Sequence, residues 1–305
     1  MSKSTTKILV IVGPTASGKS DMALKIARKF NGEIISADSR QVYRGMDIGT
    51  GKVSKKEQRF VPHHLIDVAS PKKQFTADDF KKSGQKAIKE ILAKNKVPLI
   101  VGGTGFYIDV LIGKILVAEV PPNPKLRKRF GKLSAEHLLK MLRKLDPERA
   151  KTIDPKNKCR IIRALEIVLT TGKPVPSPTL SIKYEVLWLG LNPGKEKLAV
   201  KIKKRLDDRL KKGMIGEIKN LRKQGISWKR LDDFGLEYRW ISRWLKNNPQ
   251  SIIRNAKFKS SEEYLNLLRD IIKYSKRQMT WFKRNKEIHW IKNLKESEKL
   301  IQHFL

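Results

Sequence analysis

The residues best suited to chemistry form a glycine-containing loop near the N-terminus. Gly13–Ser20 reads GPTASGKS and satisfies the pattern G-x-x-x-x-G-K-[ST] of phosphate-binding loops. In such a loop, backbone N–H groups point at phosphate oxygens, Lys19 adds a cation, and the Ser20 hydroxyl can hold Mg²⁺. The loop predicts a phosphorylated ligand without deciding which one, and ATP is only the commonest case.

A carboxylate follows the next strand-like run. Asp38 comes just after Glu33–Ser36, a run typical of a buried strand. A carboxylate there can hold magnesium-bound water, as in nucleotide hydrolases, or act as a general base toward a group attacking near the phosphates. An aspartate that only caps a turn is the alternative. The strand predicted at Pro98–Val101 runs into Gly102 rather than an aspartate, which disfavours an ATPase.

Alternating strand and helix patterns must position these groups. A β-branched run, Lys7–Val12, precedes the phosphate loop, and helical patterns reach to Phe30 and extend from Thr76 to about Asn95. This alternation predicts an α/β fold, a P-loop NTPase-like parallel sheet flanked by helices. Ligands of such a sheet bind beyond the carboxyl ends of its strands, where the loop and Asp38 fall.

The pattern changes near residue 117, where prolines interrupt it. Helical segments follow at 134–145 and 157–171, and a strand-like run returns at 185–191. We therefore expect a helical insertion domain at 117–183 within a discontinuous core domain formed by 1–116 and 184–305. The C-terminal part of this core is predicted to be mainly helical and basic, with a short last strand at 288–291.

Charge is the dominant feature of the composition. The 305 residues include 67 Lys and Arg against 30 Asp and Glu, a formal net charge of +37. Such a charge favours a polyanionic partner, although solubilising lysine is the alternative. A single cysteine, Cys159, excludes an internal disulfide, and the histidines show no metal-ligand spacing. With no apolar run of membrane length, we expect a cytoplasmic protein that does not enter a membrane. We also expect it to be a monomer.

Several segments together resemble a known family. The phosphate loop is followed by DSRQVYRGMDIGT (38–50), PHHLID (62–67), GGTGFY (102–107), RIIRALEI (160–167) and KRQMTWFKR (276–284). These segments, in this order, are similar to those of the tRNA dimethylallyltransferases, also called tRNA isopentenyltransferases, of the bacterial type without a zinc finger. The resemblance implies transfer of a dimethylallyl group from dimethylallyl diphosphate to N6 of adenosine 37 in the tRNA anticodon stem-loop.

The resemblance also implies roles for individual residues. Asp38 would be the general base, and Ser20 would serve Mg²⁺ and diphosphate. The diphosphate would be bound by Gly13, Pro14, Thr15, Ala16, Ser17, Gly18, Lys19 and Ser20, with a catalytic arginine from the helix after the insertion. Both Arg205 and Arg209 match the family pattern, and Arg209 is the preferred candidate. The tRNA would be contacted by Asp38, Ser39, Arg40, Gln41, Thr104, Arg127, Cys159, Arg160, Ile161, Ile162 and Arg163.

Two helical faces add to this picture. In the helix near 195–212, Leu198, Ile202, Leu206 and Leu210 form an apolar stripe beside a basic row of Lys201, Arg205 and Arg209. On the last long helix, Arg277, Gln278 and Trp281 share a face with Tyr274 and are predicted to stack on or hydrogen-bond to unpaired bases. The alternative is that the two aromatic residues belong to the core.

Two other functions remain open on the sequence alone. A P-loop kinase for a nucleotide or metabolite would share the loop and the sheet, but it has no need of so basic a surface. A non-catalytic RNA-binding protein would explain the charge but not the ordered site motifs.

Overall fold

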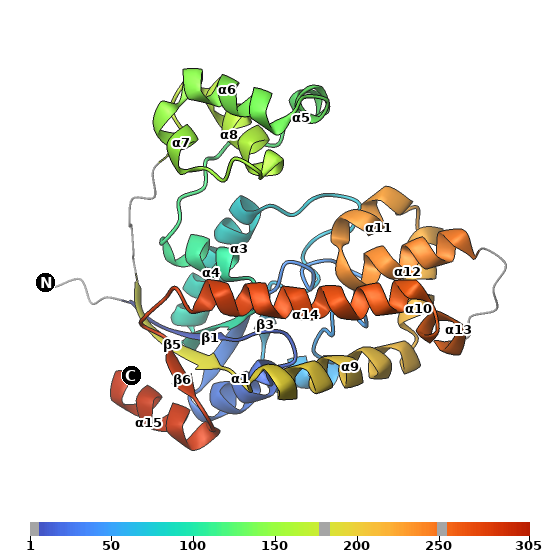
Figure 1. Cartoon of the computed structure of the whole chain (residues 1–305). Coiled ribbons are helices and arrows are strands. Elements are labelled where there is room, and N and C mark those ends of the chain that lie inside the picture. The colour runs from blue at the N-terminus through green and yellow to red at the C-terminus, as the bar shows by residue number, and fades with distance from the viewer. Residues whose placement is uncertain (1–5, 177–183, 249–254) are drawn as a thin grey trace, which may run out of the picture. The chain divides into compact units, whose positions relative to one another are not determined.

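A computed structural model describes residues 6–176, 184–248 and 255–305 (Figure 1). The chain divides into two compact units, one formed by Met1–Ile112 with Ile182–Leu305 and the other by Gly113–Ser181. The boundaries expected from the sequence are at 117 and 183. The second of these falls within 177–183, which lies outside the described residues.

A parallel sheet lies at the centre of the larger unit. Its six strands, in the order β3-β2-β4-β1-β5-β6, pair in parallel throughout the described residues. The strands are β1 (Thr6–Val12), β2 (Gly32–Ala37), β3 (His63–His64), β4 (Val97–Gly102), β5 (Tyr184–Leu191) and β6 (His289–Ile291). This confirms the predicted fold class. The two-residue strand β3 was not predicted, because two residues are too short to show a period.

Helices cover both faces of this sheet. On one face, α1 and α15 pack on the apolar side chains of β1, β4 and β5. On the other face, α3 and α4 do so, with Phe80, Ile88 and Ile108 fully buried. These helices are α1 (Lys19–Lys29), α3 (Ala77–Ala93), α4 (Gly105–Ile112) and α15 (Leu294–Phe304), and a short helix, α2 (Lys55–Phe60), precedes β3. Because β1 is central, the phosphate loop that follows it lies on a rigid scaffold.

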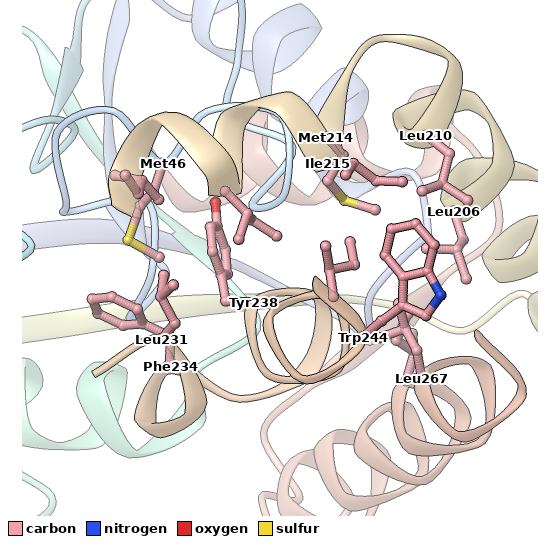
Figure 2. Packing of buried hydrophobic residues seen from close by; sticks show 14 of the residues in the cluster. Met46, Leu206, Leu210, Met214, Ile215, Leu231, Phe234, Tyr238, Trp244 and Leu267 are labelled. Carbon is pink, nitrogen blue, oxygen red and sulfur yellow. The ribbon is translucent and has the colours of Figure 1, made fainter. Parts of the chain in front are cut away.

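The C-terminal helices form a second apolar cluster within the same unit (Figure 2). They are α9 (Lys195–Lys211), α10 (Met214–Lys223), α11 (Trp228–Phe234), α12 (Leu236–Asn247), α13 (Asn255–Lys259) and α14 (Glu262–Phe282). The predicted stripe of α9 is buried there, from Leu198 to Leu210. Met46 and Tyr238 join the cluster from the loop after β2 and from α12. The cluster therefore fixes which faces of α9 and α14 remain available for a site.

The smaller unit is helical in its described residues. Its helices are α5 (Pro124–Gly131), α6 (Ala135–Leu145), α7 (Pro147–Thr152) and α8 (Lys158–Thr171). They share a core of their own around Phe130, Leu138 and Leu165. The side chains of Asn123, Ser134, Asp146 and Asn157 cap the helix N-termini by accepting a backbone N–H bond.

Among the helices of the described residues, none is both long and apolar enough to cross a bilayer.

Candidate active site

A cavity of about 470 Å³ opens at the carboxyl ends of β1, β2 and β4. Its walls come from the phosphate loop, from the segment after β2, from the loop after β4, and from α9, α12 and α14. Lys19, Ser20, Asp38, Arg205 and Arg209 all line it. The volume lies within the range of about 300–1,000 Å³ that small-molecule sites occupy. The structure therefore brings the predicted catalytic residues of the larger unit into one cavity.

The phosphate loop leads directly into α1. Gly18, at φ +91°, occupies the left-handed region just before the helix, where a side chain would be strained. The ammonium group of Lys19 donates to the carbonyl oxygen of Pro14 at 3.2 Å. Burial, followed by the neighbouring charge of Arg205, lowers the pKa of Lys19 to about 8. The loop thus presents a cation that is incompletely satisfied until an anion binds.

Asp38 is held by a turn of its own segment. Its Oδ1 accepts the backbone N–H groups of Arg40 at 2.8 Å and of Gln41 at 3.3 Å. Within the described parts of the chain, its Oδ2 accepts no hydrogen bond. The turn interpretation of Asp38 is therefore confirmed. Because Asp38 also lines the cavity, its role as a general base stays a prediction.

The neighbours of Asp38 are also fixed. Thr104 accepts the N–H of Ser39 at 3.3 Å, and Arg40 donates through Nε to the carbonyl oxygen of Phe234 at 2.7 Å. Gln41 accepts the hydroxyl of Ser36 at 3.0 Å. Burial and the charge of Asp38 raise the pKa of the nearby Tyr274 to about 12, so its hydroxyl stays protonated. This side of the cavity offers polar groups that can orient a heterocycle.

The two candidate arginines of α9 have different partners. Arg209 donates to Glu237 at 2.8 Å and to the carbonyl oxygen of Gly49 at 2.9 Å, so its charge is already paired. Arg205 donates to the hydroxyl of Thr15 in the phosphate loop at 3.4 Å. Burial, and then Arg209, lower the pKa of Arg205 to about 10. The geometry therefore favours Arg205, rather than the preferred Arg209, as the contact to a bound diphosphate.

Sequence reasoning missed the carboxylate that organises the loop after β2. Glu217 of α10 accepts the backbone N–H groups of Asp47, Ile48 and Gly49 at 2.8, 2.6 and 3.0 Å, and the hydroxyl of Tyr238 at 2.8 Å. Gly49 in turn holds Arg209 through its carbonyl oxygen. A signal that could have pointed to Glu217 is the four-residue spacing of Arg205, Arg209, Gly213 and Glu217.

Two of the predicted base contacts on the last long helix have partners within the protein. Gln278 is only 6% exposed, and its amide bonds to Thr15 and Gly103 within the protein. The indole of Trp281 donates to Asp109 at 2.9 Å and packs edge-on against Phe106. Both side chains thus help to pack α14 on the sheet unit, and Gln278 also lines the cavity. Their contact with unpaired bases stays a prediction. Arg277 is exposed and remains a candidate.

The predicted tRNA contacts of the smaller unit fall into three groups. Arg127 and Arg163 both bind the fully buried carboxylate of Glu166, at 2.9 and 2.6 Å, which holds the pKa of Glu166 below its usual value despite burial. Cys159 and Arg160 are exposed, and Ile162 is half-buried. Ile161 is 0% exposed, so the prediction that its side chain contacts tRNA is wrong, since it fills the core of this unit.

The residues of the site fit a Mg²⁺ ion that takes most of its ligands from a bound phosphate and water. The described residues contain no group of three or more His, Cys, Asp or Glu side chains able to hold a metal. Ser20, exposed at the start of α1 and lining the cavity, would supply one hydroxyl ligand. Mg²⁺ commonly keeps several waters and takes its remaining ligands from substrate phosphates, and the residues present fit that mode.

The sequence matches known proteins over nearly its full length. A family model described as IPP transferase matches residues 41–285. The tRNA dimethylallyltransferase of Pelotomaculum thermopropionicum is 38% identical over 308 residues, covering 97% of this chain and 94% of the relative. A tRNA dimethylallyltransferase of Geotalea uraniireducens is 37% identical over 305 residues, covering 97% of each chain.

Solved structures agree with this match. The tRNA delta(2)-isopentenylpyrophosphate transferase of Staphylococcus epidermidis superposes with a TM-score of 0.68 at 36% identity, covering 98% of each chain. A eukaryotic dimethylallyltransferase, described as acting on tRNA, gives a TM-score of 0.75 at 27% identity and covers 91% of this chain and 70% of that one.

Proposed function

Since the chain belongs to the IPP transferase family of tRNA dimethylallyltransferases, we propose that it transfers a dimethylallyl group from dimethylallyl diphosphate to N6 of adenosine 37 in the tRNA anticodon loop. One observation carries the proposal: Lys19, Arg205 and Asp38 line the same cavity. The cations suit the diphosphate that leaves, and the carboxylate suits the amine that attacks.

The reaction exchanges one bond at the allylic carbon. The N6 nitrogen forms a bond to C1 of the dimethylallyl group, while the bond from C1 to the diphosphate oxygen breaks and its electron pair leaves with the diphosphate. The proton on N6 passes to Oδ2 of Asp38, because an exocyclic adenine amine is a poor nucleophile without a base. The products are N6-dimethylallyl adenosine and diphosphate.

The developing charge on the diphosphate needs donors that are already in place. The N–H groups at the start of α1, the ammonium group of Lys19 and the guanidinium of Arg205 supply them. Mg²⁺, held by Ser20 and the diphosphate, would neutralise further negative charge when bound. The already paired Arg209 keeps the loop after β2 in position through Gly49.

The tRNA must present its base outside the anticodon stack, since a stacked adenine cannot reach a carboxylate inside a cavity. We assign the polar wall formed by Ser39, Arg40, Gln41 and Thr104 to the flipped base and its neighbours. The exposed Arg277 of α14, and separately the exposed face of α8 with Cys159 and Arg160, are assigned to the RNA. The net charge of +37 suits this polyanionic substrate.

A transfer assay tests this function. The protein is incubated with Mg²⁺, an unmodified tRNA transcript and radiolabelled dimethylallyl diphosphate, and in parallel with ATP and the same tRNA. Label should enter the tRNA, and mass spectrometry should place it on adenosine 37. Release of phosphate from ATP without transfer of label would favour a kinase, and RNA binding without either reaction would favour a non-catalytic RNA-binding protein.

A further inference from the structure

We propose that Gln278 is a positioning residue for this transfer, because its side chain joins the phosphate loop and the loop after β4 to helix α14. The proposal rests on the function proposed above. It adds a residue that fixes the position of the diphosphate site relative to the base site. Gln278 acts through the two loops and not on the reacting atoms.

The hydrogen bonds of Gln278 span three distant parts of the chain. Its Oε1 accepts the backbone N–H of Thr15 at 2.8 Å, and its Nε2 donates to the carbonyl oxygen of Gly103 at 2.8 Å. If the amide were flipped, a donor would face the N–H of Thr15 and an acceptor would face the carbonyl of Gly103. The two partners therefore fix the orientation of the amide, and the amide fixes the separation of the two loops.

The packing at Gly103 is an independent observation. A Cβ atom added to Gly103 would lie 2.1 Å from Nε2 of Gln278 and 3.6 Å from the carbonyl oxygen of Gly13. Real Cβ atoms do not approach other heavy atoms as closely as 2.1 Å. Glycine at 103 therefore leaves the space that the amide of Gln278 fills, close to the start of the phosphate loop.

The two ends of this connection belong to the two halves of the reaction. On the diphosphate side, Thr15 is held twice, by Gln278 at its N–H and by Arg205 at its hydroxyl. On the base side, Gly103 precedes Thr104, whose hydroxyl accepts the N–H of Ser39 next to Asp38. Loss of the amide would let the diphosphate cradle shift relative to Asp38, and a misplacement of 1 Å can cost about 10²-fold in rate.

The first test replaces Gln278 with methionine, which has a similar length but makes neither hydrogen bond. We expect Gln278→Met to weaken binding of inorganic diphosphate, measured by calorimetry, and to raise KM for dimethylallyl diphosphate, each by about 10-fold or more, with kcat reduced. The KM for tRNA should stay within about twofold, because both polar atoms of the amide are already bonded to backbone groups of the two loops. Thermal unfolding of each variant shows whether the fold is retained.

A second variant tests the same contact from the other side and keeps Gln278 in place. Gly103→Ala should push the amide away and reproduce the weaker diphosphate binding of Gln278→Met. If both changes break one contact, the double variant should be little worse than either single variant. Thr280→Val is the control on the same helix. Among the described residues, the hydroxyl of the exposed Thr280 bonds only to the carbonyl of Lys276, so this change should leave all constants unchanged.

Arg277→Met gives the contrast. Because Arg277 is the exposed neighbour of Gln278, its replacement should raise KM for tRNA and leave diphosphate binding unchanged. A rise in KM for tRNA in Gln278→Met with normal diphosphate binding would make Gln278 an RNA contact and overturn the proposal. Additive effects of the Gln278 and Gly103 variants would also overturn it. If the wild-type protein transfers no label, the proposed function fails, while diphosphate binding still tests the connection separately.

Discussion

The two carboxylate oxygens of Asp38 have different roles, one structural and one chemical. Oδ1 closes the turn with Arg40 and Gln41, and Oδ2 is the oxygen that we assign to the adenine proton. This division gives matched variants: Asp38→Asn keeps an acceptor for the turn and loses the base, whereas Asp38→Ala loses both.

We expect Asp38→Asn and Asp38→Ala to bind tRNA normally and to lose about 10²–10⁴-fold in turnover, the range for a removed general base. Single-turnover transfer of label and RNA binding by filter retention measure the two effects. Near-normal turnover in Asp38→Asn would remove Asp38 from the mechanism.

Lys19 should make diphosphate binding depend on pH. Its pKa of about 8 means that the free enzyme loses the ammonium charge as the pH rises above about 8. A bound anion favours the charged form, so affinity for dimethylallyl diphosphate should fall above pH 8, approaching about tenfold per pH unit. In Lys19→Arg, whose guanidinium stays protonated, calorimetry between pH 7 and 9.5 should not show this fall. If affinity fell equally with pH in the wild-type protein and in Lys19→Arg, Lys19 would be excluded as the source of the pH dependence.

The two arginines of α9 should separate by phenotype. Arg205→Gln should raise KM for dimethylallyl diphosphate by about 10-fold or more with little loss of stability, since it removes only a donor to the site. Arg209→Gln leaves the carboxylate of Glu237 without its partner and should lower the thermal midpoint. Steady-state kinetics and thermal unfolding measure the two effects. The assignment would be contradicted if Arg209→Gln, and not Arg205→Gln, impaired diphosphate binding without a loss of stability.

At the scale of elements, the site depends on helices that hold loops. Neither α10 nor α14 carries a group that we assign to a reacting atom, yet Glu217 and Gln278 fix the loops after β2, β1 and β4. Each helix is held in turn by its apolar face, as for the cluster in Figure 2 that includes Met214, Tyr238 and Leu267. The loops need such partners because their backbone N–H groups have no strand or helix partner.

Removal of the Glu217 carboxylate should release the loop at Asp47–Gly49. In Glu217→Ala, three backbone N–H groups lose a charged acceptor, so their hydrogen exchange should accelerate by about 10-fold or more. Tyr238→Phe removes only the hydroxyl donor to Glu217 and should leave this exchange nearly unchanged. Equal exchange in wild type and Glu217→Ala would mean that the carboxylate does not hold the loop.

At the scale of the whole molecule, the net charge of +37 should dominate the affinity for tRNA. Neutralised phosphates release counterions, so the logarithm of the association constant should fall linearly with the logarithm of salt concentration. Each exposed cation that contacts a phosphate contributes about one unit of slope, so Arg160→Gln should flatten the line by about that amount. A flat response in the wild-type protein would exclude a large phosphate footprint.

The amino-acid sequence by itself determined the features that are local. The strand, loop and helix around Gly13–Ser20, the aspartate at the end of β2, the apolar stripe of α9 and the basic charge all follow from composition or from patterns within about ten residues. The ordered motifs likewise predicted the family that the comparisons confirmed. These features do not depend on which distant segments finally meet, because hydrophobic period and turn chemistry act over short stretches of chain.

Only the tertiary structure decided which side chains far apart in the sequence contact one another. Gln278 meets Thr15 across 263 positions, and Glu217 meets the loop at Asp47–Gly49 across 168 to 170. The choice between Arg205 and Arg209, one turn apart on the same helix face, likewise rests on Glu237 lying beside one and Thr15 beside the other. Helical spacing places both arginines on one face, but their partners depend on how the helices pack, and one sequence carries no local signal for that.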